Sequence, residues 1–131
     1  MQYLMHMLRL RLIIQFILIF NFSALAQKWN FQDLVGNWRA ANGAGLQVID
    51  SNNIFVVYEN EKKKAERAFV DFKTNPSSLD FEIKDSNSTY ILKTIFQFVS
   101  KDLIQWQVFE GERPANFTAN NGELVFLRRK Q

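Results

Sequence analysis

The residues Leu79-Asp80-Phe81-Glu82-Ile83-Lys84 alternate strictly between apolar and charged side chains. A period of two is the pattern of a β-strand that has one buried face and one solvated face. The stretch therefore predicts a strand at 79–84. Its three apolar side chains should point into a core, and its three charged side chains should point to solvent.

The same period continues on both sides of this strand, and turn signals interrupt it about every 8–12 residues. Besides 79–84, we expect strands at 36–41, 45–50, 54–59, 66–72, 89–99, 102–109 and 124–128. Residues 28–35, which precede them, are predicted to form one helical turn. Residues 60–64 mix glutamate with three lysines, so we expect a solvated, charged turn there.

About eight short antiparallel strands in one domain form either a small barrel or a sandwich. We favour an all-β, up-and-down barrel, because closing the sheet removes its edges and the chain shows little obvious edge protection. No long amphipathic helix follows the first helical turn, and we see no internal repeat. The sequence therefore predicts one small barrel domain.

The first 26 residues have the three parts of a signal peptide. Arg9 and Arg11 precede an apolar run at 12–22, and Ala24-Leu25-Ala26 places small residues where signal peptidase cleaves. The apolar run is shorter than the roughly 20 residues that span a membrane. We expect a signal peptide at 1–26 and a mature domain at 27–131, periplasmic or secreted. After cleavage it should be monomeric and have no membrane span.

The composition of the mature part excludes several kinds of chemistry. The chain has no cysteine, and its only histidine and all three methionines lie within the first seven residues. Thiol catalysis, Ser-His-Asp catalysis, disulfides and zinc sites built from Cys or His are therefore excluded after residue 26. We find no catalytic constellation of carboxylates or of serine with lysine. The prediction is a protein that is not an enzyme and holds no cofactor and no metal.

Charge gives little indication of a partner. Without Arg9 and Arg11 the chain has 14 basic and 13 acidic residues, and no long basic face stands out. Nucleic acid is therefore not expected as a partner.

Leu34-Val35-Gly36-Asn37-Trp38 resembles the Gly-x-Trp signature that opens the first strand of lipocalin-type barrels after a short helical turn. The resemblance is closer to small bacterial secreted lipocalin-like domains. These pair that opening with a late segment similar to Glu112-Arg113-Pro114-Ala115-Asn116-Phe117 and with a final strand that ends in basic residues, here 124–129. Asp71-Phe72, Pro76 and Leu79-Asp80 also fit the family's spacing. The similarity covers most of 31–129.

The resemblance implies an up-and-down barrel in which Trp38 closes one end. In lipocalins a basic residue after the last strand packs across this tryptophan, and Arg128 or Arg129 is the matching candidate here. The expected structural motif comprises Gly36, Trp38, Arg113, Pro114, Phe117 and Arg128. The second lipocalin motif has no clear match, and the chain is shorter than true lipocalins. A small barrel can be filled by its own side chains, so a hollow and a filled interior both remain open.

Two functions follow from these alternatives. A hollow barrel would bind a small hydrophobic molecule, and the candidate lining residues are Tyr90, Phe96, Phe98, Ile104 and Trp106. A filled barrel would act as a protein-binding or inhibitory module through the loop 110–121. In that loop Arg113 either clamps an anionic group or pairs with Glu110 or Glu112. We expect the ligand-binding function.

Overall fold

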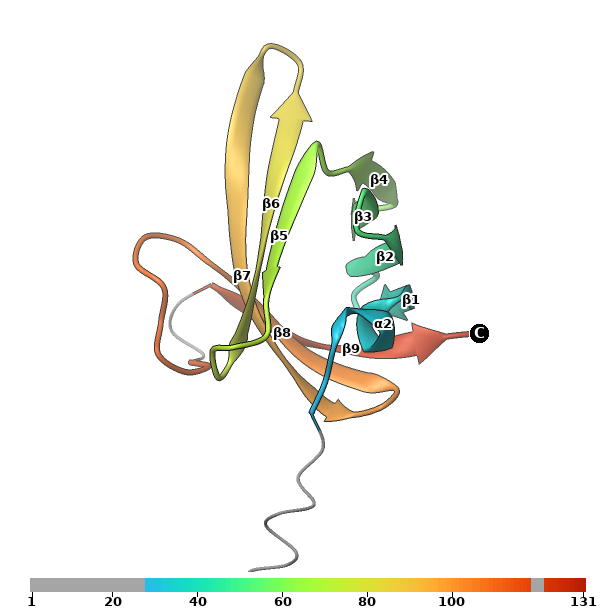
Figure 1. Cartoon of the computed structure of the whole chain (residues 1–131). Coiled ribbons are helices and arrows are strands. Elements are labelled where there is room, and N and C mark those ends of the chain that lie inside the picture. Colours follow the sequence, from blue (N-terminus) through green and yellow to red (C-terminus); the bar gives the residue numbers. More distant parts are fainter. Residues whose placement is uncertain (1–27, 119–121) are drawn as a thin grey trace, which may run out of the picture.

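A computed structural model describes residues 28–118 and 122–131, and these are almost entirely β-structure (Figure 1). The elements are α2 (Phe31–Leu34), β1 (Gly36–Arg39), β2 (Gly45–Asp50), β3 (Asn53–Tyr58), β4 (Glu61–Lys64), β5 (Arg67–Asp71), β6 (Ser77–Asp85), β7 (Ser88–Ser100), β8 (Leu103–Phe109) and β9 (Glu123–Lys130). The predicted signal peptide lies outside the described residues. No helix within 28–118 or 122–131 has the length and apolar character to cross a membrane.

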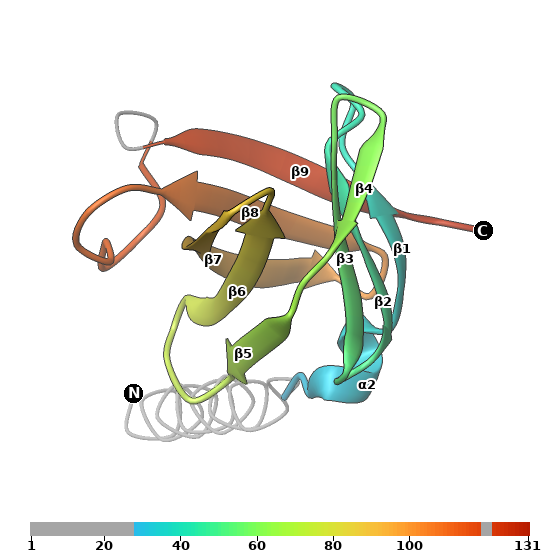
Figure 2. The same cartoon turned by 90° about the horizontal axis from the view of Figure 1, so that it is seen from above.

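All nine strands belong to one antiparallel sheet, in the order β4-β3-β2-β1-β9-β8-β7-β6-β5. Neighbouring strands are consecutive in the chain except at β1 and β9, where Trp38 lies opposite Arg129. The sheet curls strongly, so that β2 to β4 face β5 to β7 across the interior (Figures 1 and 2). The prediction of an all-β, antiparallel fold is confirmed.

The sheet is not closed, because no ladder of hydrogen bonds joins its end strands β4 and β5 within the described residues. Instead, the two residues between β4 and β5 donate backbone hydrogen bonds to strands in opposite halves of the sheet. The Ala65 amide donates to the Ile54 carbonyl of β3 (2.9 Å), and the Glu66 amide donates to the Glu82 carbonyl of β6 (2.8 Å). The sheet therefore has nine strands and two edges, where the sequence predicted about eight strands and closure.

The additional strand is β4, in the segment predicted to be a charged turn. The turn itself is only Glu59-Asn60, and both residues have left-handed backbone conformations, with φ of 48° and 65°. Two residues of this kind connect strands with the natural twist of a hairpin. The lysines of 62–64 then lie on an edge strand, where charged side chains oppose pairing with another chain. The chain thus does protect this edge.

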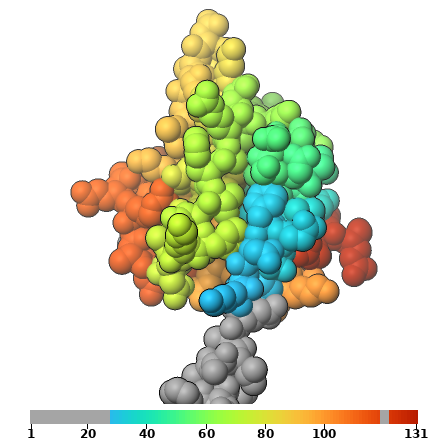
Figure 3. Space-filling model, in the orientation of Figure 1, coloured from blue at the N-terminus to red at the C-terminus, as the bar shows by residue number. Residues whose placement is uncertain are grey.

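The core lies on the inner face of the curled sheet. Leu79, Phe81 and Ile83 are buried there, as their alternation predicts. Side chains from other strands complete it, among them Trp38, Leu46, Ile54, Phe96, Ile104 and Leu127. Within the sheet, the β6–β7 hairpin is the longest and its tip projects beyond the body of the molecule (Figure 3).

The loop after β8 covers part of the outer face. Ile95 and Gln107 are paired across β7 and β8 on this face, yet both are buried. The Gln107 side-chain amide forms hydrogen bonds with both backbone groups of Thr118, and its oxygen accepts from the Thr118 amide at 3.1 Å. Gln107 and the inner-face residue Trp106 therefore point to opposite faces of β8, and the loop covers Gln107.

Candidate ligand-binding site

One end of the curled sheet is filled, and we call it the closed end. Trp38 is 0% exposed there, and its indole Nε1 donates a hydrogen bond of 2.9 Å to the Leu34 carbonyl at the end of α2. Phe98 meets the Trp38 ring edge to face at 6.1 Å and stacks on Trp29 at 4.4 Å, both measured between ring centres. These rings pack the interior around Trp38.

Arg129 covers the closed end from outside. Its guanidinium carbon lies 4.3 Å from the centre of the Trp38 ring, and Nη1 donates to the Val35 carbonyl at 2.6 Å. Gly36 has a φ of +146°, and a Cβ there would lie 2.5 Å from Nη1 of Arg129. The glycine of the Gly-x-Trp motif is therefore needed where the arginine crosses the chain. Of the two candidates Arg129 has this role, and Arg128 is exposed.

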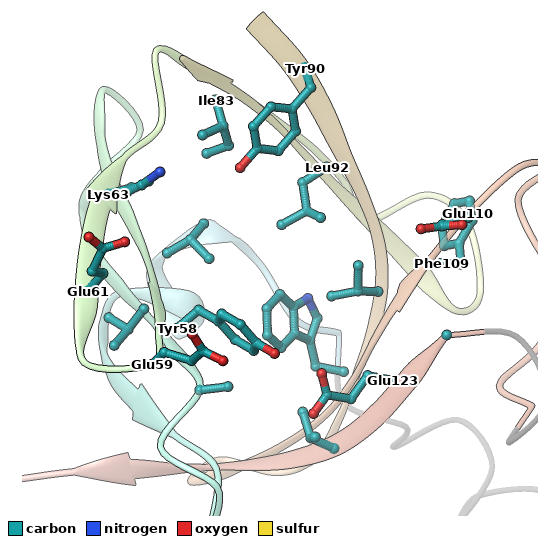
Figure 4. Close-up of a pocket in the computed structure, with 17 residues that line it drawn as sticks. Tyr58, Glu59, Glu61, Lys63, Ile83, Tyr90, Leu92, Phe109, Glu110 and Glu123 are labelled. Carbon is teal, nitrogen blue, oxygen red and sulfur yellow. The ribbon is translucent and has the colours of Figure 1, made fainter. Parts of the chain in front are cut away.

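The other end of the sheet holds a cavity of about 650 Å³. It lies at the strand ends remote from Trp38, between the β3–β4 hairpin, the β6–β7 hairpin and the start of β9 (Figure 4). Its wall is mainly apolar and includes Val56, Ile83, Leu92, Trp106, Val108 and Val125. Its mouth is mainly polar and includes Tyr58, Glu59, Glu61, Lys63, Tyr90, Glu110 and Glu123. The interior therefore holds this cavity at one end and the packed rings around Trp38 at the other.

Trp106 is the polar exception in the apolar wall. The residue is only 3% exposed, and no described residue accepts a hydrogen bond from its buried indole Nε1–H. A buried donor without an acceptor costs about 1–3 kcal/mol, and native structures hold few of them. Other atoms of Trp106 line the cavity, whereas protein atoms cover Nε1 itself.

The mouth directs polar groups inward from several strands. Figure 4 shows the hydroxyl groups of Tyr58 and Tyr90 and the ammonium of Lys63 directed into the cavity. Lys63 Nζ lies 3.1 Å from the Asp85 carboxylate, whose hydrogen bond raises the pKa of Lys63 above its usual value. Lys63 is thus a cation at neutral pH and is paired. The carboxylate of Glu123 accepts a hydrogen bond of 2.8 Å from the Asn42 side chain.

The five predicted lining residues divide between the two ends. Tyr90 and Trp106 line the cavity. Phe96, Phe98 and Ile104 do not, because they are buried in the core on the side of the closed end.

Sequence reasoning missed the contributions of β3 and β4 to the mouth. Tyr58 lies opposite Glu61, and Val56 lies opposite Lys63, so these four side chains share the inner face. The alternation of Ile54, Val56 and Tyr58 continues through the two-residue turn into Glu61 and Lys63. This continuation could have predicted β4, but the charged side chains of residues 61–64 led to the prediction of a turn.

Arg113 is held on the outer face and does not point into the cavity. Its Nη2 lies 2.6 Å from the Asp80 carboxylate, and its Nη1 donates to the Thr94 carbonyl at 3.1 Å. The guanidinium also lies over the Phe109 ring, 5.2 Å from its centre. Asp80 points outward, as predicted, and it rather than Glu110 or Glu112 is the ion-pair partner. Pro114 and Phe117 are half-buried in the same loop.

We predict that Arg113→Ala lowers the free energy of unfolding by about 1 kcal/mol, because the pair is partly exposed but has two hydrogen bonds. Urea unfolding followed by circular dichroism measures this change. Arg67→Ala is the control, since Arg67 is largely exposed and lies 3.9 Å from Glu82. Its expected effect is near zero. Equal effects of the two substitutions would show that Arg113 does not fasten the loop.

The described residues contain no group of three or more His, Cys, Asp or Glu side chains placed to hold a metal ion. We find no match to this chain among protein-family models, curated proteins or solved structures. The geometry of the cavity is therefore the basis on which a function can be inferred.

Proposed function

We propose that this protein binds one small, mainly apolar molecule in the cavity, as an exported, lipocalin-like carrier without catalytic activity. The observation that carries the proposal is a cavity of about 650 Å³ with a mainly apolar wall and a mainly polar mouth. The curled sheet then functions as a barrel-like cup with one closed end and one mouth.

Size and lining both support this proposal. Pockets that bind small molecules have volumes of roughly 300–1,000 Å³ and are mostly apolar, with a few polar groups that orient the ligand. Here the apolar wall supplies the surface for burial, and the two tyrosine hydroxyls supply the orienting groups.

The test is a fluorescence titration with N-phenyl-1-naphthylamine, an uncharged apolar probe. The unchanged domain should bind the probe. Val108→Trp should weaken binding about 100-fold, because the larger side chain fills the cavity from its wall. Val99→Trp is the matched control on the exposed side of β7, and it should bind the probe like the unchanged domain.

Circular dichroism and urea unfolding first establish that both variants are folded. Val125→Phe is a smaller substitution in the same wall and serves if Val108→Trp does not fold. The proposal fails if the unchanged domain does not bind the probe. It also fails if a folded wall variant binds as tightly as Val99→Trp, because the probe would then lie on the surface.

A further inference from the structure

We propose that the ligand carries a positive charge at the mouth of the cavity, as an amine or a quaternary ammonium group attached to an apolar body. This inference rests on the proposed function, because it describes the occupant of the same cavity. It follows from the charge of the mouth and from the aromatic rings there.

The mouth has an excess of negative charge. Its side chains include four carboxylates and one ammonium, and the ammonium of Lys63 is paired with Asp85. The whole chain has a formal net charge of +3, so this excess is a local property and not a reflection of the composition. Glu59, Glu110 and Glu123 are among the residues that line the mouth (Figure 4). A cation entering the mouth is therefore attracted, and an anion is repelled.

Aromatic rings occupy the same mouth. Tyr58 and Tyr90 are 55% and 45% exposed, and both line the cavity. They come from strands on opposite sides of the interior, β3 and β7 (Figure 4). The face of an aromatic ring attracts an ammonium group that lies within about 6 Å of its centre. The two tyrosines can therefore contact a cation that the carboxylates attract.

Three molecules with the same decyl chain test the inference by displacing N-phenyl-1-naphthylamine from the full domain. They are decan-1-ol, which is neutral, decyltrimethylammonium, which is cationic, and decanoate, which is anionic. At low salt we expect the cation to displace the probe at a concentration about tenfold lower than decanoate. Added salt should reduce this difference, because salt screens exposed charges.

A matched pair of triple variants locates the effect. Glu59→Gln, Glu61→Gln and Glu123→Gln together should bring the ratio of the two affinities close to one and leave decan-1-ol unchanged. Glu66→Gln, Glu82→Gln and Glu112→Gln make the same change of net charge at residues that do not line the cavity. This control should keep the preference of the unchanged domain.

The outcomes separate the inference from the function on which it rests. If neither the probe nor any decyl compound binds, both fail. If decan-1-ol displaces the probe but the cation has no advantage over decanoate, only the inference fails. A preference that is lost equally in both triple variants would reflect net charge and would also overturn it. If the mouth variant does not fold, the single variants Glu59→Gln and Glu61→Gln should each reduce the preference by a smaller factor.

Discussion

Trp38→Ala should lower the free energy of unfolding by about 3–5 kcal/mol, the usual cost of removing a buried tryptophan from a packed core. Domains of this size are stable by only about 5–15 kcal/mol in total. A large fraction of the stability therefore depends on this one side chain.

The size of the effect follows from the contacts of the closed end. The substitution removes a fully buried ring, leaves the Leu34 carbonyl without its donor and takes the ring from beneath Arg129. Phe98 also loses the ring that it meets edge to face. The surrounding strands cannot collapse into the space, because β1 is held between β2 and β9.

Urea unfolding monitored by far-ultraviolet circular dichroism measures this loss, with Trp106→Ala as the matched control. Trp106 is almost as deeply buried, but one side of it already borders the cavity and its Nε1–H has no described acceptor. Trp106→Ala should therefore cost about 2 kcal/mol less than Trp38→Ala. Equal losses would mean that the two ends of the interior are packed alike, contrary to the structure.

Arg129→Ala should have the second-largest effect on stability, a loss of about 2–4 kcal/mol. The guanidinium donates to the carbonyls of Val35, Asp33 and Lys101 and pairs with Asp102 at 3.1 Å. Hydrogen bonds from a charged group contribute about 1.5–3 kcal/mol each and are not additive. Without the arginine, the chain that enters β1 loses its attachment to β9 and to the β7–β8 turn.

The control for this experiment is a substitution of the neighbouring residue, Arg128. Arg128→Ala makes the same change of charge at an exposed position and should alter stability by less than about 0.5 kcal/mol. Arg129→Lys keeps the charge but lacks the planar fork of donors, so it should recover only part of the loss. Full recovery by lysine would show that charge alone, rather than the set of hydrogen bonds, fixes this end.

Local patterns in the sequence predicted most of the strands. The alternation around Phe81 gave the correct inner face of β6, and the alternation around Trp106 gave that of β8. The motif of Gly36 and Trp38 also marked the start of β1 correctly. These predictions succeeded because each depends on side chains within one strand.

Features that depend on long-range geometry could not be predicted. The inner face of β7 lines the cavity at Tyr90 and fills the core at Phe98, and only the curl of the sheet separates these two environments. The β4 strand carries no apolar residue, because its inner side chains belong to the polar mouth. Arg113 and Asp80 are 33 residues apart in the sequence, and the pattern of charges does not predict an ion pair at that separation.

The pairing of β1 with β9 has a consequence for the order in which the fold can form. The strand pairs from β1 to β4 and from β5 to β9 are consecutive hairpins, and contacts between near neighbours form quickly. They give two half-sheets linked in the chain only by Ala65 and Glu66. Among the described residues, a backbone ladder joins the two half-sheets only where β9 pairs with β1. A chain that stops before Glu123 would leave β1 and β8 as bare edges, open to pairing with other chains.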